Sequence, residues 1–238
     1  MRALADAREE GEEEQAEASA LWAEIFPAQT AGYDRCRAAA ERAEGERSTT
    51  VEDTRFFYGE ADLVSMEKIL NVAGVNDGDA FIDLGSGAGK AVVAAALLRP
   101  RALSSARGIE MLPDLHTIAM EARSAYALAM EASCGGAHMR PQVDFVLGDM
   151  LSEPLVDVQI VYVFATTFPR SLVLEIEMKL SAELRVGARV CLVSKVFENT
   201  FLEWEEVGTA PLYQPLGNDE RPVESHAALT VTVYRKVA

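Results

Sequence analysis

The stretch FIDLGSGAGKAVVAAALL, Phe81–Leu98, joins a short apolar strand to an apolar helix through a turn with a glycine at every second position. The glycines are Gly85, Gly87 and Gly89, and Asp83 stands two residues before the first of them. Glycine has no Cβ, so a turn of this composition lets the backbone approach a bound molecule closely. We therefore take this turn as a candidate ligand-binding loop and ask which ligand its spacing fits.

Two common nucleotide-binding loops do not fit this spacing. A phosphate-binding P-loop requires G-x-x-x-x-G-K-[ST], but Ala91 follows Lys90 and the glycines are spaced differently. The dinucleotide fingerprint G-x-G-x-x-G requires a small third residue at position 90, where the lysine stands. The pattern that remains, D-x-G-x-G-x-G, is typical of S-adenosylmethionine-dependent methyltransferases. A glycine-rich turn without a ligand is the alternative.

Acidic residues at the ends of the next two expected strands support a methyltransferase cofactor site. Glu110 ends the second strand, where a carboxylate can accept hydrogen bonds from both ribose hydroxyls. Asp149 follows the third strand and can accept the adenine amino hydrogens, while Met150 can pack on the adenine face. Asp83 places a negative charge beside the cationic amino-acid part of the ligand. Together these residues predict S-adenosyl-L-methionine as the cofactor.

Helix and strand signals alternate from Asp62 onward, which predicts a parallel sheet covered on both faces. We expect strands at 79–85, 106–111, 143–149, 158–164 and 188–195, and helices at 62–74, 90–99, 114–132 and 171–187. Two last strand-like segments, 201–208 and 228–237, have no helix between them and predict an antiparallel pair at the sheet edge. The expected fold class is α/β. It is a doubly wound, mostly parallel, seven-stranded class I methyltransferase (Rossmann-like) sheet with an antiparallel C-terminal hairpin and an N-terminal helical extension.

The composition sets the broad class and the kind of partner. The chain has 238 residues, of which 49% are hydrophobic and 25% charged, as in ordinary globular proteins. The formal net charge is -16 and no Lys/Arg cluster is visible, so we expect no direct grip on nucleic acid. A basic protein substrate, or a basic partner subunit, suits this charge better. No apolar run is long enough to span a membrane, and no secretory signal is expected.

The cysteines and the N-terminal region carry less information. Cys36, Cys134 and Cys191 are far apart and form no CxxC pattern, which argues against a disulfide framework or a zinc site, so no metal is expected. Residues 1–50 are predicted to be an acidic tail and helical extension, and residues 51–238 the methyltransferase catalytic domain. Four apolar residues in the extension, at helical spacing, either dock on that domain or mediate self-association: Leu21, Trp22, Ile25 and Phe26.

Four segments, FFYGEADLVSMEKIL, FIDLGSGAGKAVVAAALL, GIEM and LGDML, resemble the non-SET histone lysine methyltransferases, the disruptor-of-telomeric-silencing family. The resemblance covers about Phe57–Lys195, and the YGE sequence before the first helix is its most specific part. In that family this loop folds over the cofactor, a role that the resemblance gives to Tyr58, Gly59 and Glu60. Lys90 stands near the cofactor, where the family usually has glutamine. The resemblance implies methylation of a histone H3 lysine, chromatin regulation and the nucleus.

The loop after the fourth expected strand, VFATTFPRSL, departs from that family. The family has a pair of asparagines there, followed by an aromatic residue, an alanine and a second aromatic residue. Phe168 matches the second aromatic. The asparagines are replaced by Phe164 and Ala165 or, if the loop is shifted, by Thr166 and Thr167. The family's basic segment that grips nucleosomal DNA has no counterpart, and His226 and Ala227 stand where a tyrosine near the last strands is expected.

A lysine substrate must arrive neutral, although the pKa of a free lysine is about 10.4. A narrow apolar channel lowers that pKa, and we expect Phe57 and Phe168 to wall it. The hydroxyls of Thr166 and Thr167 are the candidate acceptors for the amine hydrogens. The alternative is an ordinary strand-to-helix turn, with a threonine as helix cap and Phe168 in the core. Functional alternatives are methylation of another protein or of a small molecule, and a non-catalytic cofactor-binding regulator.

Overall fold

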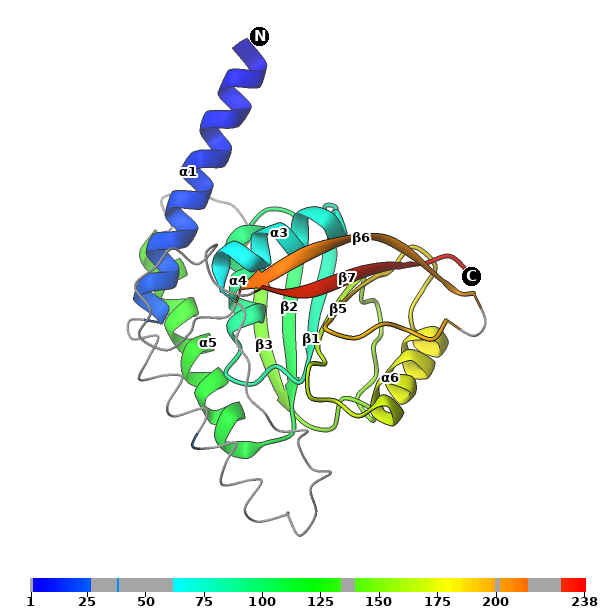
Figure 1. Cartoon of the computed structure of the whole chain (residues 1–238). Coiled ribbons are helices and arrows are strands. Elements are labelled where there is room, and N and C mark those ends of the chain that lie inside the picture. The colour runs from blue at the N-terminus through cyan, green and yellow to red at the C-terminus, as the bar shows by residue number, and fades with distance from the viewer. Residues whose placement is uncertain (1, 27–37, 39–61, 134–139, 200–201, 214–227) are drawn as a thin grey trace.

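The computed structural model describes residues 2–26, 38, 62–133, 140–199, 202–213 and 228–238. Its centre is a seven-stranded sheet in the order β3-β2-β1-β4-β5-β7-β6 (Figure 1). The strands are β1 Asp79–Leu84, β2 Leu103–Glu110, β3 Gln142–Leu147, β4 Ile160–Phe164, β5 Arg189–Val193, β6 Trp204–Tyr213 and β7 Ala228–Lys236. Strands β1 to β5 are parallel, while β7 runs antiparallel to both β5 and β6. The expected fold class is therefore confirmed.

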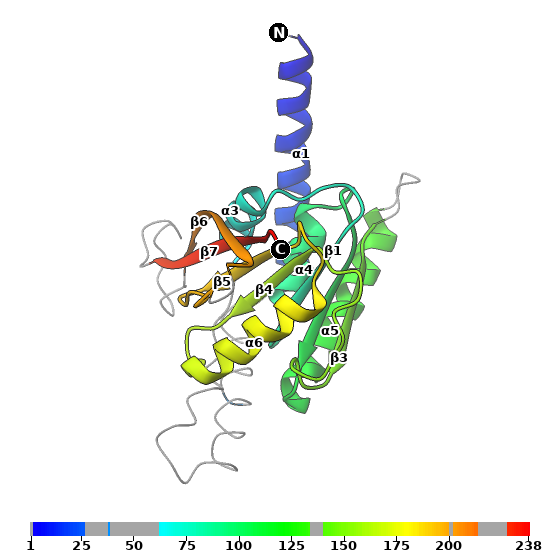
Figure 2. The same ribbon diagram turned by 90° about the vertical axis from the view of Figure 1, so that its right-hand side faces the viewer.

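The sheet separates two layers of helices (Figures 1 and 2). The described helices are α1 Arg2–Ile25, α3 Leu63–Ala73, α4 Lys90–Leu98, α5 Pro113–Ser133 and α6 Arg170–Glu183. Phe81 packs in the core with α1, α3, α4 and α5, whereas its neighbour Ile82 packs in the core with α6. Successive residues of a strand point to opposite faces, so each buried central strand must be apolar on both sides.

The N-terminal helix docks on the same molecule through its C-terminal end. Ala18, Leu21, Trp22 and Ile25 are buried in the core that α4 and α5 also enter. Their spacing of three or four residues places them on one face of the helix. All nine residues of α4 are buried, which explains why every residue after Lys90 in this helix is apolar. Docking, rather than self-association, therefore accounts for the apolar stripe of the extension.

Some element ends differ from the expected ones. Helix α6 ends at Glu183, because Leu184 adopts an extended backbone conformation and buries its side chain. Gly187, the expected end of that helix, instead lies in the turn that leads into β5. Strand β2 begins at Leu103, before the expected apolar segment, and β6 continues to Tyr213. These ends depend on neighbouring strands and helices rather than on local apolar patterns.

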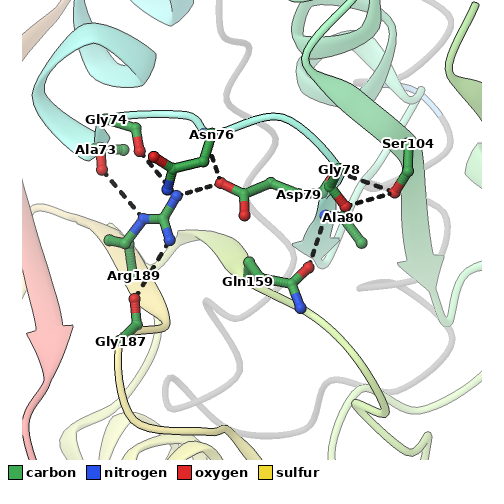
Figure 3. Close-up of polar contacts among 10 residues, drawn as sticks. All are labelled: Ala73, Gly74, Asn76, Gly78, Asp79, Ala80, Ser104, Gln159, Gly187 and Arg189. Atoms are coloured by element: carbon green, nitrogen blue, oxygen red, sulfur yellow. Dashed lines mark hydrogen bonds and ion pairs between the residues drawn. The ribbon is translucent and has the colours of Figure 1, made fainter.

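A buried arginine ties α3 to the amino end of the sheet (Figure 3). The guanidinium of Arg189, the first residue of β5, forms an ion pair with Asp79, the first residue of β1. Its nitrogens also donate to the carbonyl oxygens of Ala73 (3.2 Å) and Gly74 (2.8 Å), at the C-terminal end of α3. The Asp79 carboxylate accepts a further hydrogen bond from the Asn76 N–H, at 2.8 Å. Helix carbonyls that have no intrahelical partner are thus satisfied by a buried side chain.

Candidate functional site

The expected site residues gather at the carboxyl edge of the sheet. Strand β1 pairs with β2 on one side and β4 on the other, so the chain order reverses at this point. Open α/β sheets bind ligands in the crevice beside such a reversal, outside the carboxyl ends of the strands. The loops that follow β1, β2, β3, β4 and β5 all leave the sheet at this edge. The fold therefore places the glycine turn in the position where a cofactor is bound in such sheets.

The glycines of this turn have left-handed backbones, with φ of 88° at Gly85, 53° at Gly87 and 82° at Gly89. A Cβ on Gly85 would lie 3.7 Å from the Phe168 ring, an ordinary contact distance. A Cβ on Gly89 would lie 2.6 Å from Phe145 Cε1, which is a collision. At Gly89 the missing side chain makes room for the protein core, which is a reason for glycine that the sequence alone did not indicate.

Asp83 is a buried carboxylate with an unpaired oxygen. It lies near the end of β1, is 3% exposed, and its Oδ1 has no hydrogen-bond partner among the residues that the structure describes. Burial raises the pKa of Asp83 well above its usual value, and the Glu110 carboxylate raises it further. An ionised carboxylate in such a place is costly unless a cation or a donor pairs with it. The site therefore fits a cationic group such as the ammonium of S-adenosylmethionine.

Glu110 organises the glycine turn. Its two carboxylate oxygens accept hydrogen bonds from the N–H groups of Gly87 and Leu112, each at 2.8 Å. Burial raises the pKa of Glu110, and hydrogen bonds from backbone N–H groups, that of Leu112 first, oppose this rise. Each carboxylate oxygen has a second lone pair, so Glu110 can hold the turn and still accept hydrogen bonds from ribose hydroxyls. Its role in holding the turn was not foreseen from the sequence.

The adenine-side candidates lie at the end of β3. Asp149 is exposed, and its carboxylate oxygens accept hydrogen bonds from Leu151 N–H (2.9 Å) and Ser152 Oγ (3.2 Å). It therefore caps its own turn and keeps acceptor capacity toward solvent. Met150 is half-buried and packs against the core on the α6 side.

Lys90, the first residue of α4, is buried, and its Nζ lies 5.6 Å from the centroid of the Phe26 ring just after α1. An ammonium at this distance from an aromatic face is stabilised by a cation–π interaction. The structure therefore places the charged end of Lys90 beside the docked end of the N-terminal extension.

In the loop after β4 the structure places Phe168 in the core and excludes a threonine as the cap of α6. Phe168 is 8% exposed and packs in the core on the α6 side, and its ring also faces the space in front of Gly85. Pro169, not a threonine, is the N-cap of α6. Thr166 and Thr167 are partly exposed, and Thr166 Oγ1 donates to Ser194 Oγ after β5, at 3.2 Å. The threonines therefore do not cap the helix.

A cleft of about 710 Å³ opens beside this loop, between α6, the segment after β5 and the start of β7. It contains charged, hydroxyl and apolar side chains, among them Arg170, Val173, Glu177, Ser194, Phe197 and Thr230. Trp204 belongs to the core: it is buried beside Phe197, and its Nε1 donates a hydrogen bond to Ser181 Oγ at 3.0 Å. Tyr213 is half-buried at the end of β6.

Several expected residues lie outside the described part of the chain: Cys36, Phe57, Tyr58, Gly59, Glu60, Cys134, His226 and Ala227. Within the described part, no group of His, Cys, Asp and Glu side chains could hold a metal ion. No described helix has the length and apolarity that crossing a membrane requires.

Two residues at this edge were missed from the sequence. Tyr162 on β4 and Ser86 in the glycine turn are buried, and the structure gives neither hydroxyl a partner among the described residues. The available signal was a tyrosine in the otherwise apolar run IVYVF and a serine between two glycines. Buried polar groups of this kind are rare enough in native structures to need an explanation.

Comparison with known proteins identifies the family. A family model described as "Histone methylation protein DOT1" matches residues 48–208. A comparison with curated protein sequences returned no match. Among solved structures, an RNA methyltransferase from Salinibacter ruber, in complex with S-adenosyl-L-homocysteine, is 20% identical with a TM-score of 0.52, over 75% of this chain and 94% of that one.

A putative RNA methyltransferase from Pyrococcus horikoshii is 14% identical with a TM-score of 0.51, over 81% of this chain and 92% of that one. At such identities these two likenesses concern the fold alone, whereas the family model covers more than half of the chain. The glycine turn, the unpaired Asp83 carboxylate and the carboxyl-edge position agree with this match. The chain belongs to the DOT1 histone methylation family and is a class I methyltransferase that uses S-adenosylmethionine.

Proposed function

We propose that this chain is a protein lysine N-methyltransferase, with histone H3 as its substrate. The observation that carries this proposal is the match of residues 48–208 to the histone methylation family. A nuclear location and a role in chromatin regulation follow from the same proposal. Residues 51–238 are proposed as the catalytic domain, and residues 1–50 as an acidic tail and helical extension whose helix α1 docks on that domain.

The cofactor site is proposed to follow the order of the strands. Asp83 pairs with the ammonium group, Glu110 accepts hydrogen bonds from the ribose hydroxyls, and Asp149 accepts them from the adenine amino group. When bound, S-adenosylmethionine supplies a methyl group on a positively charged sulfur. The full set proposed for cofactor binding is Tyr58, Gly59, Glu60, Asp83, Gly85, Gly87, Gly89, Lys90, Glu110, Asp149 and Met150.

The lysine side of the site is proposed to use the loop after β4. Methyl transfer depends mainly on holding a neutral amine in line with the reacting carbon. The Phe168 ring, beside Gly85, supplies an apolar wall that disfavours the charged ammonium form of the substrate. The hydroxyls of Thr166 and Thr167, two partly exposed residues, supply hydrogen-bond acceptors for the amine. These three residues are the proposed contacts of the reacting lysine.

The net charge of -16 favours a basic protein as the substrate. Opposite charges speed association, and this effect weakens as salt shortens the Debye length from about 10 Å at 0.1 M to about 3 Å at 1 M. Nucleosomal DNA is itself strongly negative, and a chain without a Lys/Arg cluster releases few counterions on it. We therefore propose that the isolated chain methylates free H3 faster than intact nucleosomes, and that a basic partner subunit recruits it to chromatin.

The test is transfer of tritium from labelled S-adenosylmethionine to core histones, intact nucleosomes and a panel of peptides and small molecules, at low and moderate salt. We expect label on H3 lysine, more from free H3 than from nucleosomes, with a rate that falls as salt rises. The Asp83→Asn variant, deprived of the carboxylate proposed to bind the cofactor, is the control and should transfer much less label when the cofactor concentration is below its dissociation constant. Label on another acceptor but not on histones would refute the histone proposal while leaving the methyltransferase intact.

A further inference from the structure

A row of buried polar side chains crosses the centre of the sheet. Asp83 on β1 lies directly opposite Tyr162 on β4, and Tyr162 lies directly opposite Cys191 on β5. Residues that are directly opposite each other in neighbouring strands have side chains on the same face. The three residues are 3%, 2% and 0% exposed, and Tyr162 and Cys191 belong to the core on the α3 and α4 side. The polar row is therefore enclosed between the sheet and these helices.

Two oxygens of this row have no hydrogen-bond partner among the residues that the structure describes. Asp83 Oδ1 and Tyr162 Oη accept and donate no hydrogen bond within the described part of the chain. The same holds for Ser86 Oγ, which lies above Gly108 on β2, where a Cβ would collide with it. Gly108 in turn pairs with Asp83 across the β1–β2 ladder. Each buried unpaired group lowers the stability of the folded protein, so three such groups on and beside adjacent strands point to a bound molecule that completes them.

The charges around Tyr162 favour a cation. Burial raises the pKa of Tyr162 well above its usual value, and the carboxylates of Asp83 and Asp62 act in the same direction. The phenol therefore stays protonated and keeps two lone pairs that can accept hydrogen bonds. The pKa of Cys191 is raised to about 12 by burial, so this thiol is neutral as well. The carboxylates of Asp83 and Asp62 place negative charge near the phenol, which suits a bound group with several N–H donors and a positive charge.

We propose that Tyr162 is a cofactor-binding residue that, together with Asp83, accepts the N–H donors of the ammonium group of S-adenosylmethionine. An ammonium has three donors, and one carboxylate oxygen leaves two of them to be satisfied. The inference depends on the proposed pairing of Asp83 with the ammonium, but not on the proposed histone substrate. It gives the buried tyrosine of β4 a role in recognising the amino-acid part of the cofactor.

The experiment is calorimetry of S-adenosylhomocysteine and of its desamino analogue with the wild-type protein and with Tyr162→Phe. Phenylalanine removes one oxygen atom that has no partner in the described protein, so the fold is expected to persist, which thermal unfolding checks. Tyr126→Phe is the matched control, because Tyr126 is also a buried tyrosine, but its hydroxyl donates to the Pro141 carbonyl at 3.2 Å, in the loop before β3. The Asp83→Asn variant and a combined Asp83→Asn, Tyr162→Phe variant complete a double-mutant cycle.

We expect Tyr162→Phe to weaken S-adenosylhomocysteine binding roughly tenfold, since a hydrogen bond to a charged group is lost. The desamino analogue should bind wild type and variant alike, and the Tyr126→Phe affinities should match those of wild type. Equal affinity of wild type and Tyr162→Phe for S-adenosylhomocysteine would refute the role of Tyr162 alone. An equal loss with both ligands would show that the effect does not pass through the ammonium and would also refute it. Failure of the wild type to bind S-adenosylhomocysteine would instead overturn the cofactor site itself.

Discussion

Asp79 and Asp83 begin and nearly end the same strand, β1, and both are buried, with exposures of 6% and 3%. Asp79 is paired with Arg189 and also accepts the Asn76 N–H, in the cluster of Figure 3. Asp83 has an oxygen without a partner in the described protein, and the neighbouring Tyr162 hydroxyl is unpaired as well. The carboxylate at the amino end of β1 is thus satisfied by protein contacts. The carboxylate near the carboxyl end of β1 has an oxygen for which the described residues supply no partner.

This difference separates stability from function along one strand. A buried carboxylate that meets a guanidinium and backbone donors costs little, and it fixes the position of α3 against the sheet. A buried carboxylate without a partner lowers the stability of the empty protein and is retained where a ligand supplies the partner. The predictions that follow test whether the two ends can be perturbed independently.

The largest effect on stability is expected at the amino end of β1, where Arg189 pairs with Asp79. Arg189→Met leaves Asp79 buried without its cation and should lower the free energy of unfolding by about 3–5 kcal/mol. Cofactor affinity of the molecules that remain folded should not change. Denaturant unfolding and calorimetry measure the two quantities, and Arg101→Met, at an exposed arginine paired with Glu14, is the control that should change stability by no more than about 0.5 kcal/mol. A variant of Arg189 as stable as wild type would contradict the role of this pair.

The next effect compares two glycines of the cofactor turn. Gly89→Ala combines a left-handed backbone with a collision against Phe145 and should cost about 3 kcal/mol of unfolding free energy. Gly85→Ala shares the backbone conformation but meets only an ordinary contact with Phe168, so it should cost about 1 kcal/mol. Thermal or denaturant unfolding of both variants is the measurement. Equal losses would show that the Phe145 contact does not set the requirement for glycine at position 89.

Near the carboxyl end of β1, Asp83→Asn should change cofactor affinity and stability in opposite directions. Losing the carboxylate should weaken S-adenosylhomocysteine binding roughly 10- to 100-fold. The pKa of Asp83 is raised in the folded state, so its contribution to stability is full below its unfolded pKa of about 3.9 and is lost as pH rises through the folded pKa. The ligand-free variant should therefore melt at a higher temperature than wild type at pH 8, with a smaller difference at pH 5. A variant that melts lower at pH 8 would contradict this account.

The smallest effect is expected at Glu110, because backbone N–H groups of the protein already donate hydrogen bonds to this carboxylate. Glu110→Ala removes the acceptors for two backbone N–H groups and the acceptors proposed for the ribose hydroxyls. We expect about 1–2 kcal/mol less cofactor binding energy and a similar loss of stability. Calorimetry together with unfolding separates the two. Weaker binding with unchanged stability would mean that Glu110 serves the ligand but does not hold the glycine turn.

The sequence by itself determined the elements and the kind of ligand. Apolar runs separated by amphipathic segments gave the helices and strands, and the motif around Asp83 with the acid at Glu110 pointed to S-adenosylmethionine. These are local signals, because the period of a helix or strand and the spacing of a turn are written in neighbouring residues. The sequence did not decide whether the extension docks on the catalytic domain or self-associates, since an apolar stripe alone does not identify the surface that covers it.

Only the tertiary structure decided which distant residues complete each other. Gly89 must be glycine because Phe145 of β3 fills the space before it, and Arg189 of β5 pairs with Asp79 of β1. In the sequence, Tyr162 is one more residue of an apolar strand. Only the strand order shows that it lies directly opposite Asp83. Packing and the pairing of buried charges join residues that are far apart in the chain, and no local spacing encodes them. The sequence therefore specified a cofactor loop, while the fold decided which buried polar groups are left without a partner among the described residues.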